Sequence, residues 1–246
     1  PQDGLPGLNR RARRGHDLGH NARPGQGHSR MAQGDDSPLG GHAAGINGDS
    51  QALDDSIQGA YRVLSENHYQ FDIIDEYQDW SPYSMVLLPD IITLDPTLLE
   101  KISTYLDAGG RILMSWRSGL KLGTTEFLPQ AGLNFLQEEG LSKQFFQATD
   151  PLAKDLPAEP IVLYDKGYWV QPGKNTRTLA HLWSPYFTRT WKHFCSHRHS
   201  PPSAPNGYPA WTRNGNVVYC SHPIFRMIQN HGVLAYKRIV RNAVDH

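Results

Sequence analysis

The stretch "LDPTLLEKISTYLDAGGRILMSWRSG", residues 94–119, decides the fold class. Asp95 suits the N-cap of a helix and Pro96 its first position. Gly109 or Gly110 can end that helix in the left-handed conformation. The apolar stripe between these ends has helical spacing: Leu98, Leu99, Ile102 and Leu106. The apolar run that follows, "RILMS", predicts a strand. A helix joined so closely to a buried strand is typical of the right-handed crossover in an open α/β sheet.

The sequence on both sides continues the alternation of helix and strand. Residues 51–69 predict a helix with one apolar face, made of Ile57, Ala60, Tyr61 and Leu64. Short apolar runs at 71–76 and 83–90 predict strands. Beyond residue 150, three segments predict strands with turns: 159–172, 176–187 and 207–225. Asn214-Gly215 suits a hairpin turn, and residues 232–244 predict a closing helix. We therefore expect an α/β domain with a β-rich C-terminal portion.

Length and composition limit the class of protein. A chain of 246 residues can bury one good core. No apolar run approaches the roughly 18 residues of a membrane helix, and the arginine-rich amino terminus lacks the apolar region of a signal peptide. The two cysteines, Cys195 and Cys220, cannot form a disulfide framework. They fit a reducing compartment or simply low cysteine use, and we expect a cytoplasmic protein.

Residues 1–45 differ from the rest of the chain. They are rich in glycine, arginine and histidine, and neither valine nor isoleucine occurs before Ile46. Such a segment cannot bury enough apolar area to offset the entropy of ordering it, which predicts disorder. A basic interaction tail and a coding region read out of frame are both compatible with this composition. We place the domain boundary near residues 43–49 and the folded domain at 46–246.

The net charge of zero conceals an uneven distribution. Residues 42–165 carry 19 acidic and 7 basic side chains, whereas residues 166–246 carry 11 basic and 1 acidic. Two interpretations remain open: opposite-sign surfaces of one fold, or a head-to-tail oligomer in which one subunit's acidic surface meets its neighbour's basic surface. Because no basic run with interleaved aromatic residues matches a known nucleic-acid reader, we expect no nucleic-acid partner. We expect no membrane partner either.

The segments "FDIIDE" (71–76) and "YSMVLLPDIITLDPTLLEKISTYLDAGGRILMSWRSG" (83–119) carry a family resemblance. They resemble the trimerisation domain of the family-42 β-galactosidases and a related domain that follows the catalytic barrel in other glycoside hydrolases. Residues 186–244 resemble the end of the same group. The resemblance implies a class I glutamine amidotransferase-like fold: a flavodoxin-like, doubly wound, mainly parallel sheet. It also implies a non-catalytic domain that mediates trimer contacts near the barrel's sugar site.

Two features depart from the family pattern. The family domain opens with a parallel strand before its first helix, and here that position falls in residues 1–45, which have no strand-forming run. The catalytic barrel, which carries the acid and nucleophile glutamates in such hydrolases, has no counterpart in this sequence. The paired acidic residues Glu138 and Glu139 are expected to be a solvated pair in a loop. We therefore expect no catalytic residue.

The turn after the strand "RILMS" reads Ser115-Trp116-Arg117-Ser118. Amidotransferases place a cysteine at this elbow, and the turn has none. Ser115 also lacks the small residues that flank a hydrolase nucleophile two positions away, since Leu113 and Arg117 stand there. Arg117 is expected at the carboxyl end of a parallel strand, beside the usual ligand crevice. Trp116 and Arg117 are therefore candidates to contact a ligand or a partner's acidic group, and pairing of Arg117 within its own loop is the alternative.

A histidine-rich stretch, "HFCSHRH", is a second candidate. On a strand its alternating residues would face one way: His193, Cys195, His197 and His199. His222 could join them. Although imidazole and thiolate suit zinc, the spacing fits no established zinc motif, so we expect no metal and no cofactor. We expect His193, His197 and His222 to pack at a domain or subunit contact.

Seven aromatic residues form a third candidate: Tyr164, Tyr168, Trp169, Trp183, Tyr186, Phe187 and Trp191. Aromatic rings stack on sugars, but they also anchor cores and interfaces, and we favour the second role. Trp183 is retained as a contact candidate. The sequence thus predicts an assembly domain of a carbohydrate-active hydrolase, which forms a trimer or docks on a catalytic barrel with carbohydrate nearby. The alternative is a self-standing enzyme of amidotransferase-like fold with divergent chemistry.

Overall fold

Helix α2 (Pro96–Asp107) and strand β2 (Arg111–Ser115) form as the sequence predicts, in the computed structural model of the chain. The structure describes residues 46–140 and 143–246, so the predicted disordered tail lies outside the described residues. The Asp95 carboxylate accepts a hydrogen bond from the Leu98 amide at 2.8 Å, which caps α2. Gly109 has a φ of +92° and turns the chain into β2.

The main sheet has seven strands in the order β1-β2-β9-β8-β7-β4-β5. Their bounds are β1 Met85–Leu88, β4 Gln144–Ala148, β5 Ile161–Leu163, β7 Arg177–Pro185, β8 Pro202–Asn214 and β9 Val217–Cys220. β1, β2 and β9 are parallel, and the remaining neighbours pair antiparallel. The sheet is therefore mixed, and the prediction of a mainly parallel sheet is wrong. The second half returns through hairpins instead of helical crossovers, and Gly215 makes the β8–β9 turn at a φ of +53°.

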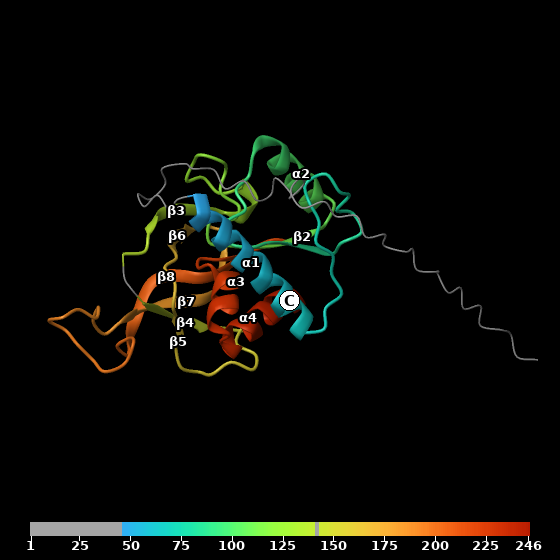
Figure 1. Cartoon of the computed structure of the whole chain (residues 1–246). Coiled ribbons are helices and arrows are strands. Elements are labelled where there is room, and N and C mark those ends of the chain that lie inside the picture. Colours follow the sequence, from blue (N-terminus) through green and yellow to red (C-terminus); the bar gives the residue numbers. More distant parts are fainter. Residues whose placement is uncertain (1–45, 141–142) are drawn as a thin grey trace, which may run out of the picture.

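Helices cover both faces of this sheet (Figure 1). α1 (Ile46–Glu66), α3 (Ile224–His231) and α4 (Leu234–Asp245) lie on one face, and α2 lies on the other. Alternation along β2 connects the two cores: Leu113 packs in the cluster of α1, α3 and α4, whereas Ile112 and Met114 pack in the cluster of α2. This confirms the α/β class.

Smaller elements complete the α2 side of the domain. β3 (Leu133–Glu138) and β6 (Tyr168–Pro172) form a two-stranded antiparallel sheet, preceded by the short helix η2 (Pro129–Ala131). Within the described ranges, no helix is both long and apolar enough to cross a membrane.

Three predictions about elements need correction. Residues 71–76 form no strand, because a strand requires a ladder partner and no described residue pairs with them. The helix at α1 is confirmed, but Tyr61 on its predicted buried face is 55% exposed. The histidine-rich stretch lies in a loop, not on a strand.

Candidate functional site

The carboxyl ends of β1 and β2 carry two non-glycine residues with positive φ. Asp90 has a φ of +50° and Trp116 a φ of +51°. This conformation is uncommon for residues with a side chain and is strained for a bulky one. Two such turns at the same edge of the sheet indicate a constrained backbone there, which makes this edge the candidate site.

Asp90 connects four elements at this edge. Its carboxylate accepts hydrogen bonds from the hydroxyls of Ser115 (2.6 Å) and Ser56 (2.8 Å). It also accepts from the amides of Arg226 (2.7 Å) and Phe225 (3.4 Å) in the first turn of α3. Complete burial raises the pKa of the Asp90 carboxyl, while the hydrogen bond from Ser115 and the others oppose that rise. Asp90 therefore ties α1, β1, β2 and α3 together.

Ser115 is part of this support. Its side chain is buried, and its hydrogen bonds run to Asp90: the hydroxyl donates to the carboxylate and accepts from the amide at 3.0 Å. Among the described residues no imidazole bonds to it. Trp116 holds the strained turn position, where an elbow-type enzyme would present its nucleophile, and an indole cannot attack a carbonyl. The side chain at the tip of this turn is therefore not a nucleophile.

The indole of Trp116 lies close to two guanidinium groups. The Cζ of Arg226 is 4.9 Å and that of Arg117 is 5.8 Å from its ring centroid, and the Tyr168 ring is 5.9 Å away. Arg226 also pairs with Asp165 at 3.0 Å. We call these five residues the carboxyl-edge site. Both Trp116 and Arg117 are partly exposed.

Within this site Arg117 has the free charge. No carboxylate among residues 46–140 and 143–246 lies within 4.0 Å of its guanidinium, whereas Arg226 is neutralised by Asp165. Burial raises the pKa of Tyr168 to about 12, so its hydroxyl stays protonated near neutrality. The arrangement can hold an anionic group on Arg117 and stack a flat or sugar-like surface on Trp116. Within its own loop Arg117 pairs only through its backbone carbonyl, which accepts from the Leu120 amide at 3.2 Å, and its backbone amide donates to the Asp90 carbonyl after β1 at 2.8 Å.

His222 does not join the other predicted histidines. It is buried, and its Nε2 lies 3.0 Å from Oε2 of Glu139 while its Nδ1 lies 2.9 Å from the Ser221 hydroxyl. Glu139 is therefore buried, which corrects its predicted place in a solvated pair, while Glu138 is exposed as expected. A Cβ on Gly167 would lie 2.5 Å from His222 Nδ1, so the chain closes tightly over this group.

The Ser221, His222 and Glu139 series has the residue types of a hydrolytic triad. None of the three exceeds 2% exposure, however, and a substrate cannot reach the hydroxyl. The Glu139–His222 contact instead joins the end of β3 to the link between β9 and α3. We assign it a structural role.

The loop between β7 and β8 carries the remaining candidates. Residues 186–201, here called the arm, project from the sheet (orange in Figure 1). His193 and His197 are exposed on it, as are Trp191 (86%) and Phe194 (68%). Three basic side chains accompany them: Arg189, Lys192 and Arg198. Over the described part of the chain, no three His, Cys, Asp or Glu side chains are placed to hold a metal ion.

Trp183 lies on β7, at the base of the arm. Its strand neighbours are Phe145 on β4 and Pro205 on β8. Its half-buried position in the sheet indicates packing. The predicted residues therefore fall into three places: the carboxyl edge (Trp116, Arg117), the buried core (His222) and the arm with its base (Trp183, His193, His197).

Sequence reasoning missed three residues that shape the carboxyl edge: Asp90, Asp165 and Arg226. Asp90 could have been found, because it directly follows the apolar run of β1 and so must end at the same edge as Trp116. Arg226 could not have been found, because its helix α3 gives little sequence signal. α3 has only eight residues and follows a proline instead of a polar cap.

Comparison with known proteins agrees with this architecture. Residues 41–133 match the family described as the β-galactosidase trimerisation domain, which confirms the resemblance. The α-L-fucosidase isoenzyme 2 of Paenibacillus thiaminolyticus is 32% identical, with a TM-score of 0.70 over 76% of this chain. The β-galactosidase of Rahnella sp. R3 is 16% identical, with a TM-score of 0.57 over 84% of this chain.

The chain corresponds to only part of both enzymes, since it spans 28% of each. A ThuA-like protein of Bacteroides uniformis has the same fold at 13% identity, with a TM-score of 0.53, over 82% of this chain and 86% of its own. The fold therefore occurs both as a portion of a larger hydrolase and as nearly a whole protein.

Proposed function

We propose that this chain is a non-catalytic assembly domain of a carbohydrate-active glycoside hydrolase. Its match to a trimerisation domain supports self-association, and its likeness to portions of a fucosidase and a β-galactosidase supports a hydrolase parent. The domain is taken as residues 46–246. A reducing, cytoplasmic location remains part of the proposal.

The observation that carries the proposal is the arm. A projecting loop that exposes Trp191 and Phe194 to water loses apolar stabilisation unless a partner covers it. Aromatic and arginine side chains together are typical of interface anchors. Two cation–π contacts already order the arm, Arg189 with Phe194 at 4.9 Å and Lys192 with Trp191 at 5.1 Å.

The carboxyl-edge site supports the finer part of the proposal. Arg117 is free to pair with an acidic group of another subunit or of a catalytic barrel, and Trp116 can lie against the partner or against carbohydrate. Because neither offers a nucleophile, the site suits contact instead of bond cleavage. No cofactor is needed for this role.

Variants of the arm test this proposal. The double variant Trp191→Ala/Phe194→Ala should elute later than wild type from a size-exclusion column at the same protein concentration, because its interface anchors are gone. Tyr77→Ala is the matched control, since Tyr77 is 74% exposed but lies outside the arm. An arm variant that elutes with wild type as an oligomer would assign the interface elsewhere, and unchanged circular dichroism would show that each variant folds.

A further inference from the structure

Strand β1 forms one edge of the main sheet. The Arg111 amide donates to the Ser84 carbonyl at 3.2 Å, and this contact sets the phase of the β1–β2 ladder. In a parallel ladder the backbone groups of alternate residues point to opposite sides. The backbone groups of Ser84, Val86 and Leu88 therefore face β2. The backbone groups of Met85 and Leu87 face away from it.

The outward groups of Met85 and Leu87 have no partner in the part of the chain that the structure describes. Two N–H donors and two C=O acceptors thus line up along this edge. Such a row is a template for another strand, and proteins normally cover or blunt it. Here it opens into a groove instead.

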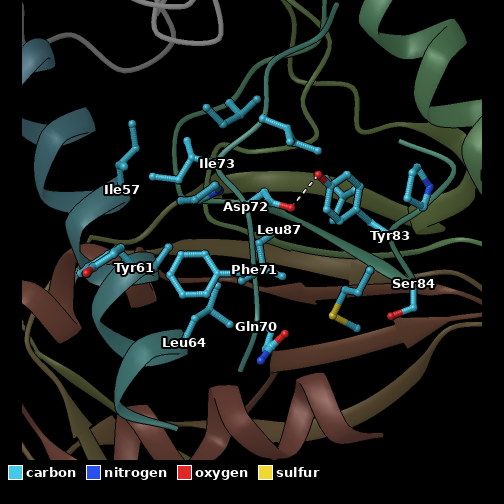
Figure 2. Close-up of a pocket in the computed structure, with 17 residues that line it drawn as sticks. Ile57, Tyr61, Leu64, Gln70, Phe71, Asp72, Ile73, Tyr83, Ser84 and Leu87 are labelled. Atoms are coloured by element: carbon cyan, nitrogen blue, oxygen red, sulfur yellow. Dashed lines mark hydrogen bonds between the residues drawn. The ribbon is translucent and has the colours of Figure 1, made fainter. Parts of the chain in front are cut away.

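The groove has a volume of about 330 Å³ and lies between α1, residues 70–74 and β1 (Figure 2). Its lining is apolar apart from a few groups, and α1 contributes four residues: Ile57, Ala60, Tyr61 and Leu64. These are the residues that the helical spacing predicts to be buried. Because Tyr61 remains 55% exposed, the helix presents a core face to a space that no described residue fills.

Residues 70–74 form another wall of the groove. The Phe71 ring packs edge to face on Tyr61, 5.6 Å between centroids, and the Tyr83 hydroxyl donates to Asp72 at 2.9 Å (Figure 2). Ile73 is 70% exposed there. This segment has the sequence pattern of a strand but no ladder, which is the expected state of a strand whose neighbour is missing.

The chemistry of an occupant follows from these walls. Met85 and Leu87 pack toward the core of α1, whereas Val86 and Leu88 pack toward the core of α2. A strand added beside β1 would therefore be covered on both faces, which requires a continuous aliphatic run. Of the lining residues only Asp72 is charged, and three acidic residues follow it: Asp75, Glu76 and Asp79. Basic flanks would complement them.

We propose that this groove is a strand-acceptor site, which takes an extended aliphatic segment with basic flanks from a separate polypeptide. Strand addition of this kind gains affinity from main-chain hydrogen bonds and specificity from side-chain pockets. Residues 1–45 lie next to α1 in the chain, but they contain no three consecutive aliphatic residues and no valine or isoleucine. They do not have the composition of the occupant. The inference is independent of the proposed assembly function.

A peptide probe tests the site with the full chain. The probe is a labelled acetyl-Lys-Val-Ile-Val-Ile-Lys-amide, and its control has the same sequence with all four aliphatic amides N-methylated. We expect saturable fluorescence anisotropy for the probe and at least about tenfold weaker binding for the control, because N-methylation removes the strand donors but keeps charge and apolar surface. Equal binding of both peptides would overturn the proposal in favour of a general apolar groove.

A protein variant that fills the groove is the matching test. Ala60→Leu places added bulk in the groove lining and should weaken probe binding at least about tenfold. Asp54→Leu adds the same side chain to an exposed position of α1 and should leave binding unchanged. An Ala60→Leu variant that is folded and binds the probe like wild type would contradict the site.

Hydrogen exchange of the β1 amides, followed by NMR, measures directly whether the edge is covered. It uses the wild-type chain and so does not depend on a variant that folds. Without peptide, the amides of Met85 and Leu87 should exchange much faster than those of Val86 and Leu88. Saturating probe should slow the first two at least about tenfold and leave the other two unchanged. If the Met85 and Leu87 amides are already protected in the free protein, this chain's own residues or a second copy cover the edge. That result would overturn the proposal. If neither the probe nor its N-methylated control binds, the proposal is overturned as well.

Discussion

At the residue scale, the carboxyl edge depends on side chains that were not singled out in advance. Trp116 and Arg117 lie at the edge, as their position after β2 predicts. Their backbone geometry depends on Asp90, which is buried below them and bonds to four groups on three other elements. Sequence spacing places a residue on a strand end, but it does not show which buried carboxylate will hold the turn.

The titration of Asp90 gives a first prediction. Burial raises its folded-state pKa above the usual value of about 3.9, so the folded state holds this proton more tightly than the unfolded state. Its contribution to the free energy of unfolding is therefore greatest below about pH 4 and is lost as pH rises through the raised pKa. Asp90→Asn removes this titration. The stability of wild type relative to Asp90→Asn should fall from pH 4 to pH 7 in urea titrations.

An exposed residue supplies the control for that experiment. Asp54→Asn, on the solvent side of α1, should show no such trend. A difference between wild type and Asp90→Asn that grows with pH would mean that the hydrogen bonds of Asp90 outweigh its burial.

At the element scale, local pattern predicted the first half of the fold better than the second. α1, β1, α2 and β2 form as expected, because their helical or strand periodicity coincides with burial. Residues 71–76 also have the apolar run of a strand, but no strand among the described residues pairs with them. The arm residues alternate histidine with other types, which says nothing about burial, and they form a loop.

The contact between α1 and α3 gives a second prediction. Gly59 lies in α1, where an alanine would ordinarily stabilise the helix by up to about 1 kcal/mol. A Cβ at this position would lie 1.9 Å from the Phe225 carbonyl oxygen, however, so the two helices would have to separate. Gly59→Ala should lower the free energy of unfolding by about 1–3 kcal/mol, measured by urea denaturation. An unchanged or higher midpoint would mean that α3 is less closely packed than described.

At the scale of the whole molecule, ion pairs join the acidic and basic parts of the sequence. Glu66 pairs with Lys237, Asp155 with Arg241 at 2.7 Å, and Asp165 with Arg226 at 3.0 Å. Each pair joins a residue of the segment 42–165 to one of the segment 166–246. The acidic and basic segments therefore neutralise each other in part within one chain. This agrees with the interpretation that they form opposite-sign surfaces of one fold.

This distribution predicts the salt response of self-association. Exposed charges are screened over about 8–10 Å at physiological salt, so an oligomer held by charge would dissociate as salt rises. If Trp191 and Phe194 anchor the interface, the apparent dissociation constant should change less than about threefold between roughly 0.05 and 0.5 M NaCl, measured by sedimentation velocity. Dissociation to monomers at the higher salt would favour the head-to-tail charge interface.

The absence of a nucleophile at the elbow predicts the outcome of activity assays. The purified chain should release no nitrophenol from nitrophenyl β-galactoside or α-fucoside above a heat-denatured control, because Ser115 and Ser221 are buried. Release that is lost in Glu139→Gln or Ser115→Ala would contradict this and support the enzyme alternative.

The most direct test of the assembly function is the mass of the wild-type chain in solution. Sedimentation equilibrium over a range of protein concentrations should show a reversible species of three times the chain mass of 27.6 kDa, and its population should fall in Trp191→Ala/Phe194→Ala but not in Tyr77→Ala. A folded chain that remains a monomer at every concentration and salt would contradict self-assembly by this domain.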